Sequence, residues 1–174
     1  MFAALVLGCQ APAPAPAPVV TPVVAPAPAR SLAPDPGDPA ATREWLQSLA
    51  YRTWTPMSEL RTTGEHGGER LFFNQTLAAS WQARAAEHPI GSAAVRELWS
   101  ADLSTIKGFA FMVKTGPSGD LGEGWYWYEV FGTAEDARPT VAEAGARGCV
   151  GCHAHAVDFV HDPATPREDP QPLL

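Results

Sequence analysis

Residues 149–153 constrain this chain more than any other stretch, because they read Cys149-Val150-Gly151-Cys152-His153. In this C-x-x-C-H pattern the two thiols stand about one helical turn apart, the spacing at which they can add to the two vinyl groups on one edge of a porphyrin. The histidine that follows projects an imidazole under the macrocycle, where a ring nitrogen can bind iron. The pattern therefore predicts one covalently attached haem c, with His153 as its metal ligand.

Two other uses of a C-x-x-C pair fit this sequence less well. A zinc site needs two further ligands at a similar spacing, whereas the only other cysteine is Cys9. A thioredoxin-type redox pair belongs at a strand-to-helix junction of a βαβ unit and has no need of the trailing histidine. With Cys149 and Cys152 both taken by haem, no disulfide framework remains, although covalent haem attachment itself indicates an exported protein.

The charge of the chain excludes several classes of partner. Its 174 residues carry a formal net charge of −7, and its only lysines are Lys107 and Lys114. Such a chain has no basic face for nucleic acid or for anionic lipid. We therefore expect no nucleic-acid partner.

The N-terminus resembles a shortened lipoprotein signal. Residues 1–7 are apolar, and Val6-Leu7-Gly8-Cys9 is similar to a bacterial lipobox, in which Cys9 becomes a lipid anchor. We expect residues 1–9 to be a truncated signal, with the natural start upstream, in a periplasmic or cell-envelope lipoprotein of a bacterium. A fortuitous cysteine after an apolar run is the alternative. Residues 10–38, rich in proline and alanine, are expected to be a disordered tether.

Residues 39–165 are expected to form one domain, followed by a disordered tail at 166–174. Helical spacing of apolar residues predicts helices at 39–54 and 75–87, the first started by Asp38 and the second capped by Asn74. Alternating patterns predict strands at 69–74, 93–99, 107–114 and 123–131. The predicted fold class is α+β, a mainly antiparallel β-sheet with flanking helices and a C-terminal helix that carries the C-x-x-C-H motif.

Several short segments occur in the order and spacing of one known family. They are Trp54 and Met57 before Gly64-Glu65-His66-Gly67; Leu71-Phe72-Phe73-Asn74; Gly91-Ser92-Ala93-Ala94-Val95-Arg96-Glu97; Gly124-Trp125-Tyr126-Trp127-Tyr128; and the haem motif followed by Asp158-Phe159-Val160. Together they resemble the cytochrome P-460 family, which also contains cytochrome c′-beta, over residues 42–162. The resemblance implies a five-coordinate haem with His153 proximal, and an open distal side facing nitric oxide or related small ligands. Because members of the family often form dimers, the resemblance also suggests a homodimer.

One position departs from the hydroxylamine-oxidising members of that family. In those proteins a lysine in the strand after the glycine turn is crosslinked to the porphyrin, and the matching residue here is Arg96. A guanidinium stays protonated and is a very poor nucleophile. We therefore expect no crosslink, which weakens the case for an oxidoreductase acting on hydroxylamine. Arg96 is instead a candidate partner of a haem propionate, or an exposed strand residue.

The resemblance to cytochrome c′-beta suggests which residues surround the distal side. The candidate aromatic caps over the iron are Phe72, Phe73, Phe109 and Phe111. Taken singly, each is more often an ordinary core residue, as aromatic residues on strands usually are. Arg70 is a candidate distal donor and Glu143 a candidate proton-handling acid, although both residue types are common on surfaces.

A second protein ligand to the iron would change the function. The candidates are Met57, Met112, His66, His88, His155 and His161. Of these, Met57 lies in a loop, Met112 fits a core position, and His155 would point away from His153 on a continuing helix. An axial methionine or histidine would make the protein a membrane-tethered electron carrier with an unidentified redox partner. The sequence thus leaves two main hypotheses, an open-site haem protein and a six-coordinate cytochrome.

Overall fold

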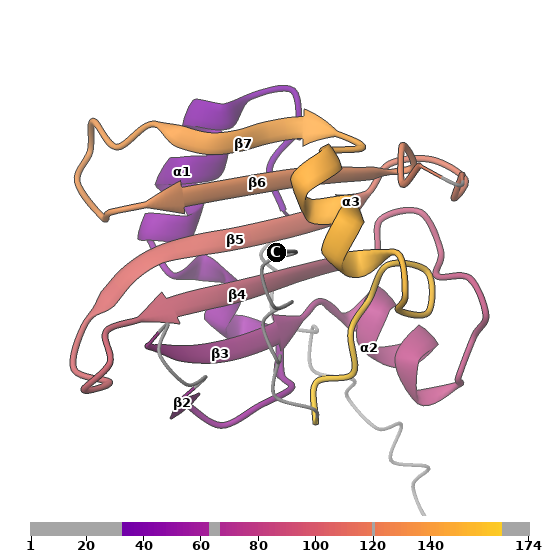
Figure 1. Cartoon of the computed structure of the whole chain (residues 1–174), viewed down its shortest axis with the longest axis horizontal. Coiled ribbons are helices and arrows are strands. Elements are labelled where there is room, and N and C mark those ends of the chain that lie inside the picture. The colour runs from indigo at the N-terminus through magenta and orange to yellow at the C-terminus, as the bar shows by residue number, and fades with distance from the viewer. Residues whose placement is uncertain (1–32, 63–66, 120, 165–174) are drawn as a thin grey trace, which may run out of the picture.

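The computed structural model describes residues 33–62, 67–119 and 121–164, which form a mainly antiparallel sheet with flanking helices (Figure 1). The strand order is β1-β3-β4-β5-β6-β7, and β2 also pairs with β3. The strands are β1 Thr55–Pro56, β2 Arg61–Thr62, β3 Gly68–Phe73, β4 Ala93–Trp99, β5 Ile106–Lys114, β6 Trp125–Phe131 and β7 Pro139–Ala144. The helices are α1 Pro39–Gln47, the 3-10 turn η1 Ala50–Thr53, α2 Gln75–Gln82 and α3 Arg147–His153. The predicted α+β fold class is confirmed.

Part of the domain organisation expected from the sequence falls outside the described residues. This applies to the signal with Cys9, to the tether as far as residue 32, to His66 and to the tail. Among the residues that are described, no helix is long and apolar enough to cross a membrane.

The first helix begins as predicted but is shorter than predicted. The Asp38 side chain accepts hydrogen bonds from the backbone N–H groups of Ala40 and Ala41 at 3.0 and 2.9 Å, and Pro39 occupies the first helical position. The helix ends at Gln47 because Leu49 adopts a left-handed conformation with φ of 58°. The predicted 39–54 helix is thus two elements, α1 and η1, separated by a turn.

The second helix is also shorter at its C-terminal end than the predicted 75–87. It begins as predicted, with the Asn74 side chain accepting from the N–H of Leu77 at 2.9 Å. It ends at Gln82, and Arg84 is left-handed with φ of 53°. The chain therefore turns back toward β4 well before Pro89, the residue expected to stop the helix.

The sheet has two buried faces, and they pack against different helices. Alternate residues of each strand point to opposite faces. One face packs against α1 and η1, with a core of Leu46, Tyr51, Trp54, Phe72, Ala93, Val95, Phe109, Phe111, Val113, Tyr126, Tyr128 and Val130. The other face packs against α2, α3 and the segment after α3, with a core of Phe73, Leu77, Ala78, Ala94, Met112, Trp125, Trp127, Ala146, Phe159 and Val160. Figure 1 shows α1 behind the sheet and α3 in front of it.

The last strand, β7, is absent from the sequence-based prediction. It pairs with β6 from Tyr126↔Ala144 to Val130↔Pro139. It is an edge strand built from small and partly exposed residues, so its apolar alternation is weak. α3 follows shortly after this strand.

Candidate haem site

A cavity of about 890 Å³ lies between the sheet and the C-terminal part of the chain. Its sheet side includes Leu71, Phe73, Ala94, Met112 and Trp127, and its other side includes Cys149 and His153 of α3 together with Val157, Val160 and His161. This volume lies within the range of roughly 300–1,000 Å³ that is usual for cofactor and ligand sites. The haem motif and the largely apolar sheet face thus border a single space.

The two motif cysteines lie one turn apart on α3. Both are half-buried and neither forms a disulfide. Cys149 borders the cavity and packs against the core on that face of the sheet. Cys152 follows on the same helix, and its carbonyl oxygen lies 3.0 Å from the Nε2 atom of His161. The helix therefore presents the thiol spacing that attachment to one porphyrin edge requires.

His153, the last residue of α3, is held by the chain that follows it. Its Nδ1 atom lies 2.7 Å from the backbone carbonyl oxygen of Phe159. A carbonyl oxygen only accepts hydrogen bonds, so Nδ1 carries the proton and Nε2 carries the lone pair. Metal-binding histidines commonly donate their second ring N–H in this way, which fixes the tautomer and the ring orientation.

Two aromatic rings pack against the imidazole of His153. The Trp127 ring is edge-on to it at a centroid distance of 4.7 Å, and the His161 ring lies at 4.4 Å. The indole Nε1–H of Trp127 is buried and has no hydrogen-bond acceptor within the described part of the chain. A buried donor at a cavity wall fits an acceptor on a bound group.

The cavity also has a polar end, formed by three charged side chains. Glu69 contacts the guanidinium of Arg61 at 2.8 Å and the Nε atom of Arg96 at 2.7 Å. Only the Arg61 contact has the geometry of a hydrogen bond, so the Arg96 contact is an ion pair without a well-directed bond. Arg96 borders the cavity beside a carboxylate. The sequence left it as either a propionate partner or an exposed strand residue.

The four phenylalanines expected to surround the distal side do not share a face. Phe73 borders the cavity, but Phe72 and Phe109 lie in the core on the α1 side of the sheet, against Tyr51. Phe111 borders the cavity, yet its ring packs against Trp45 at 5.6 Å on the α1 side. Consecutive strand residues such as Phe72 and Phe73 point to opposite faces, so the four side chains do not all border the cavity.

Arg70 and Glu143, the two other distal candidates, also lie away from the cavity wall. The Arg70 guanidinium sits 5.0 Å from the ring centroid of Phe72, which places it on the α1 side. Glu143 is an exposed residue of β7 opposite Trp127. The carboxylates that do border the cavity are Glu69, Glu129 and Asp162, and the sequence analysis selected none of them.

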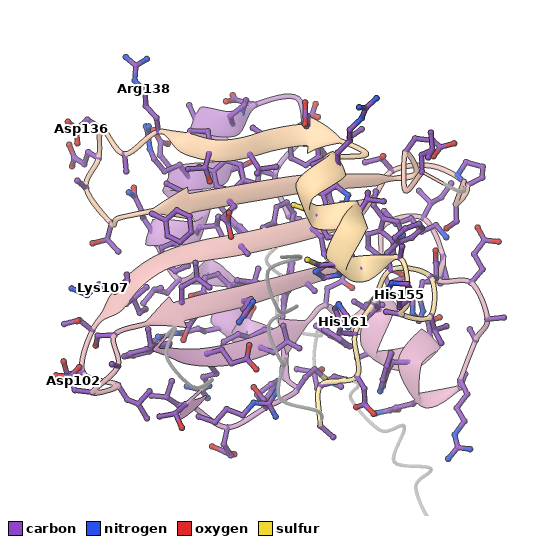
Figure 2. All side chains as sticks on the ribbon, viewed as in Figure 1. Asp102, Lys107, Asp136, Arg138, His155 and His161 are labelled. Carbon is purple, nitrogen blue, oxygen red and sulfur yellow. The ribbon has the colours of Figure 1, made fainter. Side chains whose placement is uncertain are left out.

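The candidate second ligands are spread over the molecule. Met112, His155 and His161 border the cavity, and Figure 2 shows the two histidines beside α3. His155 lies beyond the end of the helix at His153, so the helical spacing assumed for it does not apply. Met57 packs against the same core without bordering the cavity. His88 lies elsewhere, with its Nδ1 atom 2.8 Å from the hydroxyl of Ser80.

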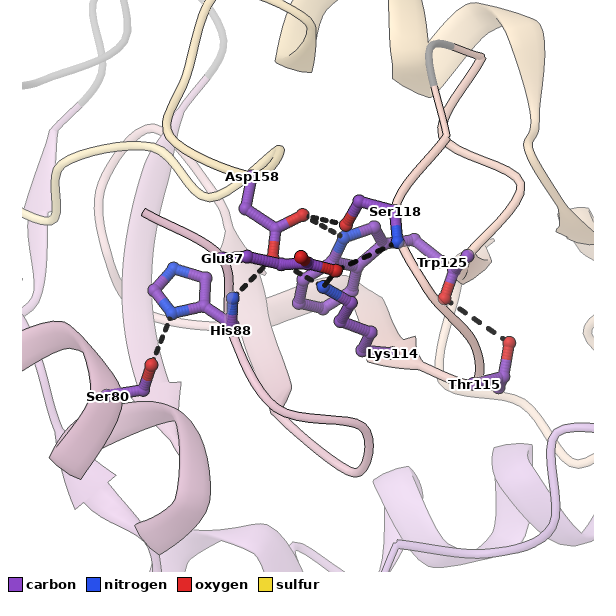
Figure 3. A network of polar contacts seen from close by, with 9 residues as sticks. Ser80, Glu87, His88, Lys114, Thr115, Ser118, Trp125 and Asp158 are labelled. Atoms are coloured by element: carbon purple, nitrogen blue, oxygen red, sulfur yellow. Dashed lines mark hydrogen bonds and ion pairs between the residues drawn. The ribbon is translucent and has the colours of Figure 1, made fainter. Parts of the chain in front are cut away.

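A buried ion pair ties the segment after α3 to the sheet (Figure 3). The ammonium group of Lys114 lies 2.7 Å from the Asp158 carboxylate, and both side chains are about 1% exposed. Burial raises the pKa of Asp158, but hydrogen bonds, chiefly those from Lys114 and Ser118, lower it by more, so the carboxyl has a pKa below its usual value. This network was not anticipated from the sequence, although Asp158-Phe159-Val160 was one of the segments that carried the family resemblance.

These residues fit a haem. Cys149 of the paired-thiol helix, a histidine in the tautomer suited to iron, and an orphaned indole donor border one cavity of suitable size, and Cys152 lies one turn from Cys149 on the same helix. The cytochrome P460 family model matches residues 49–162, well over half of the chain, and a search of curated proteins gives no match. The chain therefore belongs to the cytochrome P460 family.

Proposed function

We propose that this c-type haem protein binds its haem covalently through Cys149 and Cys152, with His153 as the only protein ligand to iron. The second axial position would then be open to nitric oxide or a related small ligand. Family membership supports the haem. The observation that carries the axial assignment is the 2.7 Å contact between His153 Nδ1 and the Phe159 carbonyl, because it leaves the lone pair on Nε2.

The bound haem would supply an iron centre that takes up a small ligand and exchanges electrons. The protein's part is to hold and surround it. Phe73, Ala94 and Met112 give the cavity an apolar wall, which would limit water beside a bound haem. The buried indole N–H of Trp127 adds one donor to that wall.

The arginines at the polar end of the cavity support a role in propionate binding. Arg61 and Arg96 share a single carboxylate, Glu69, so the trio carries a net charge of +1. A guanidinium pairs well with carboxylates because its N–H groups form a planar fork. We propose that Arg96 faces a haem propionate, with Glu69 holding its side chain in place.

A second candidate function is electron transfer by a six-coordinate haem. The specific observation in its favour is Met112, a thioether only 7% exposed that borders the cavity. An axial methionine would close the site to ligands and raise the reduction potential. Met112 replaces Met57 as the leading candidate for that ligand, because Met57 does not border the cavity.

A role as an oxidoreductase acting on nitric oxide or hydroxylamine is a third candidate. Hydroxylamine oxidation requires proton transfer, and the chosen acid, Glu143, is exposed. Arg96 borders the cavity but cannot form the lysine crosslink. These two observations place this candidate behind simple ligand binding.

We also propose that a lipid at Cys9 anchors the protein to a bacterial envelope membrane through the proline- and alanine-rich tether. The lipobox-like segment and the composition of residues 10–38 support this. We propose in addition that the protein exchanges electrons with an unidentified redox partner and that it can form a homodimer. Replacing Cys9 by serine in the full-length protein should abolish its partition into membranes, and continued partition would refute the anchor.

Titration of the ferrous protein with nitric oxide tests the proposed function. One equivalent per haem should saturate the spectral change, and carbon monoxide should compete for the same position. A ferrous protein that binds neither gas at millimolar concentration would refute the open site and favour the electron carrier.

A further inference from the structure

The segment that accepts the His153 hydrogen bond has a backbone that needs external support. Asp158 and Phe159 both have positive φ values, 46° and 64°. Aspartate tolerates this left-handed region, but a bulky residue such as phenylalanine is an outlier there. Such a conformation persists only where the surroundings over-determine it, and it concentrates at functional sites.

The Asp158 carboxylate supplies that support through both of its oxygen atoms. Oδ2 accepts from the Lys114 ammonium at 2.7 Å and from the backbone N–H of His88 at 2.6 Å. Oδ1 accepts from the hydroxyl of Ser118 and from the indole N–H of Trp125 at 3.2 Å. The donors come from β5, β6 and two loops, and Figure 3 shows them converging on one side chain.

Lys114 is the charged member of this set, and it is buried. Its ammonium also contacts the exposed Glu87 at 2.9 Å, but its main buried partner is Asp158. Leaving a buried charge without its partner is strongly unfavourable. The pair therefore fixes residue 158 firmly against the sheet, and Phe159 is the next residue along the chain.

We propose that the Lys114–Asp158 ion pair positions the proximal side of the haem. By holding residues 158–159, it aims the Phe159 carbonyl at Nδ1 of His153 and so sets how strongly His153 binds iron. Asp158 and Lys114 are positioning residues, since neither contacts His153 in the described structure. The inference rests on the proposed function, because it requires His153 to be the axial ligand.

The expected effect follows from the chemistry of imidazole. A hydrogen bond from Nδ1–H to an acceptor makes Nε2 a stronger donor to a metal. A stronger donor favours ferric over ferrous iron. If the Phe159 carbonyl is held less firmly against His153 Nδ1, the iron–histidine bond should therefore weaken and the reduction potential of the haem should rise.

The test uses the full-length holoprotein with Asp158→Asn and Lys114→Met. Asparagine removes the charge yet tolerates the left-handed backbone, so it separates the ion pair from backbone strain. Both variants should shift the ferrous iron–histidine stretching band to lower frequency in resonance Raman spectra, and both should raise the midpoint potential. Wild-type band positions and potentials in both variants would overturn the proposal.

Glu97→Gln is the matched control. Glu97 is also a fully buried carboxylate, and it accepts from Tyr51, Arg52 and Trp99, but it lies on the α1 side of the sheet. Its substitution should lower the melting temperature while leaving the band and the potential unchanged. If Glu97→Gln shifts the band as far as Asp158→Asn, the effect is general destabilisation and the proposal fails.

Ser118→Ala provides a milder test if Asp158→Asn does not take up haem. It removes one donor to the same carboxylate and should produce a smaller shift in the same direction; no shift would overturn the proposal. The proposed function fails separately. If wild-type protein lacks the iron–histidine band and His153→Ala keeps the wild-type spectrum, then His153 is not the ligand. If wild-type protein shows the iron–histidine band and the Asp158, Lys114 and Ser118 variants leave that band in place, this inference alone is refuted.

Discussion

The Nδ1 atom of His153 lies 2.7 Å from the backbone carbonyl oxygen of Phe159. This contact joins the last residue of the haem motif to a segment six positions later in the chain. It gives His153 one defined tautomer and leaves the lone pair on Nε2, the nitrogen that would bind iron in the proposed haem site. A residue outside the C-x-x-C-H motif therefore sets the tautomer of the histidine within it.

Covalent attachment of haem should depend on both motif cysteines. Cys149→Ala combined with Cys152→Ala removes both thiols, so any haem that remains is held only by His153 and by packing. Acidified organic solvent should then extract the haem completely, whereas wild-type haem should stay with the protein. Haem retained by the double variant after extraction would show that attachment runs through another residue.

The role of Met112 separates the two leading functions. If the second axial position is open, Met112→Leu preserves the size of an apolar wall residue and should leave the ferrous absorption spectrum unchanged. Met57→Leu is the control, because Met57 packs on the same core without bordering the cavity. A low-spin wild-type spectrum that becomes high-spin only in Met112→Leu would establish the electron carrier.

Stability should fall below about pH 6.5 because of His88. Burial lowers the pKa of this side chain, with Asp158 opposing the shift and Lys114 adding to it. Between the folded-state pKa and the ordinary histidine pKa of about 6.5, the unfolded chain binds more protons. The free energy of unfolding should therefore decrease as pH falls in that window, by at most about 1.4 kcal/mol per pH unit.

His88→Asn isolates this contribution, since asparagine can replace Nδ1 as the partner of Ser80. Denaturant unfolding at pH 7.5, 6.5 and 5.5 measures it. The stability advantage of wild type over the variant should shrink as pH falls. A constant difference would mean that His88 titrates alike in the folded and unfolded chains.

The loop before β6 should be intolerant of a side chain at Gly122. Gly122 has φ of 67°, and a Cβ atom there would lie 2.7 Å from a methyl group of Val150 on α3. Gly122→Ala should cost about 1–2 kcal/mol from the backbone conformation alone, with the clash against the haem helix adding to it. Gly151→Ala is the control, because space beside it is open and it does not border the cavity. Equal melting temperatures for the two variants would contradict this contact.

The sequence predicted most of the local structure but not which apolar residues border the cavity beside α3. Asp38 and Asn74 mark helix starts through their side-chain oxygens, and alternation located β3 to β6. Alternation groups residues by face, yet both faces here are apolar. Nothing local distinguishes the face under α1 from the face under α3, so alternation could not show that Phe72 and Phe109 belong to the α1 side.

The parts of the site that escaped prediction depend on contacts between distant segments. Glu69 meets Arg96 only through strand pairing, and Lys114 meets Asp158 across 44 positions of the chain. A lysine at the end of a strand normally suggests a solvated position. The ordered match to a family, by contrast, needs no long-range contact, and the family model confirms it.

The absorption spectrum of the dithionite-reduced protein, recorded before and after nitric oxide is added, tests the central claim most directly. A haem held by His153 alone should give a high-spin ferrous spectrum with an ordinary c-type Soret band. That band should shift on addition of nitric oxide, and no red-shifted crosslinked chromophore should appear. A low-spin ferrous spectrum that nitric oxide leaves unchanged would contradict the account.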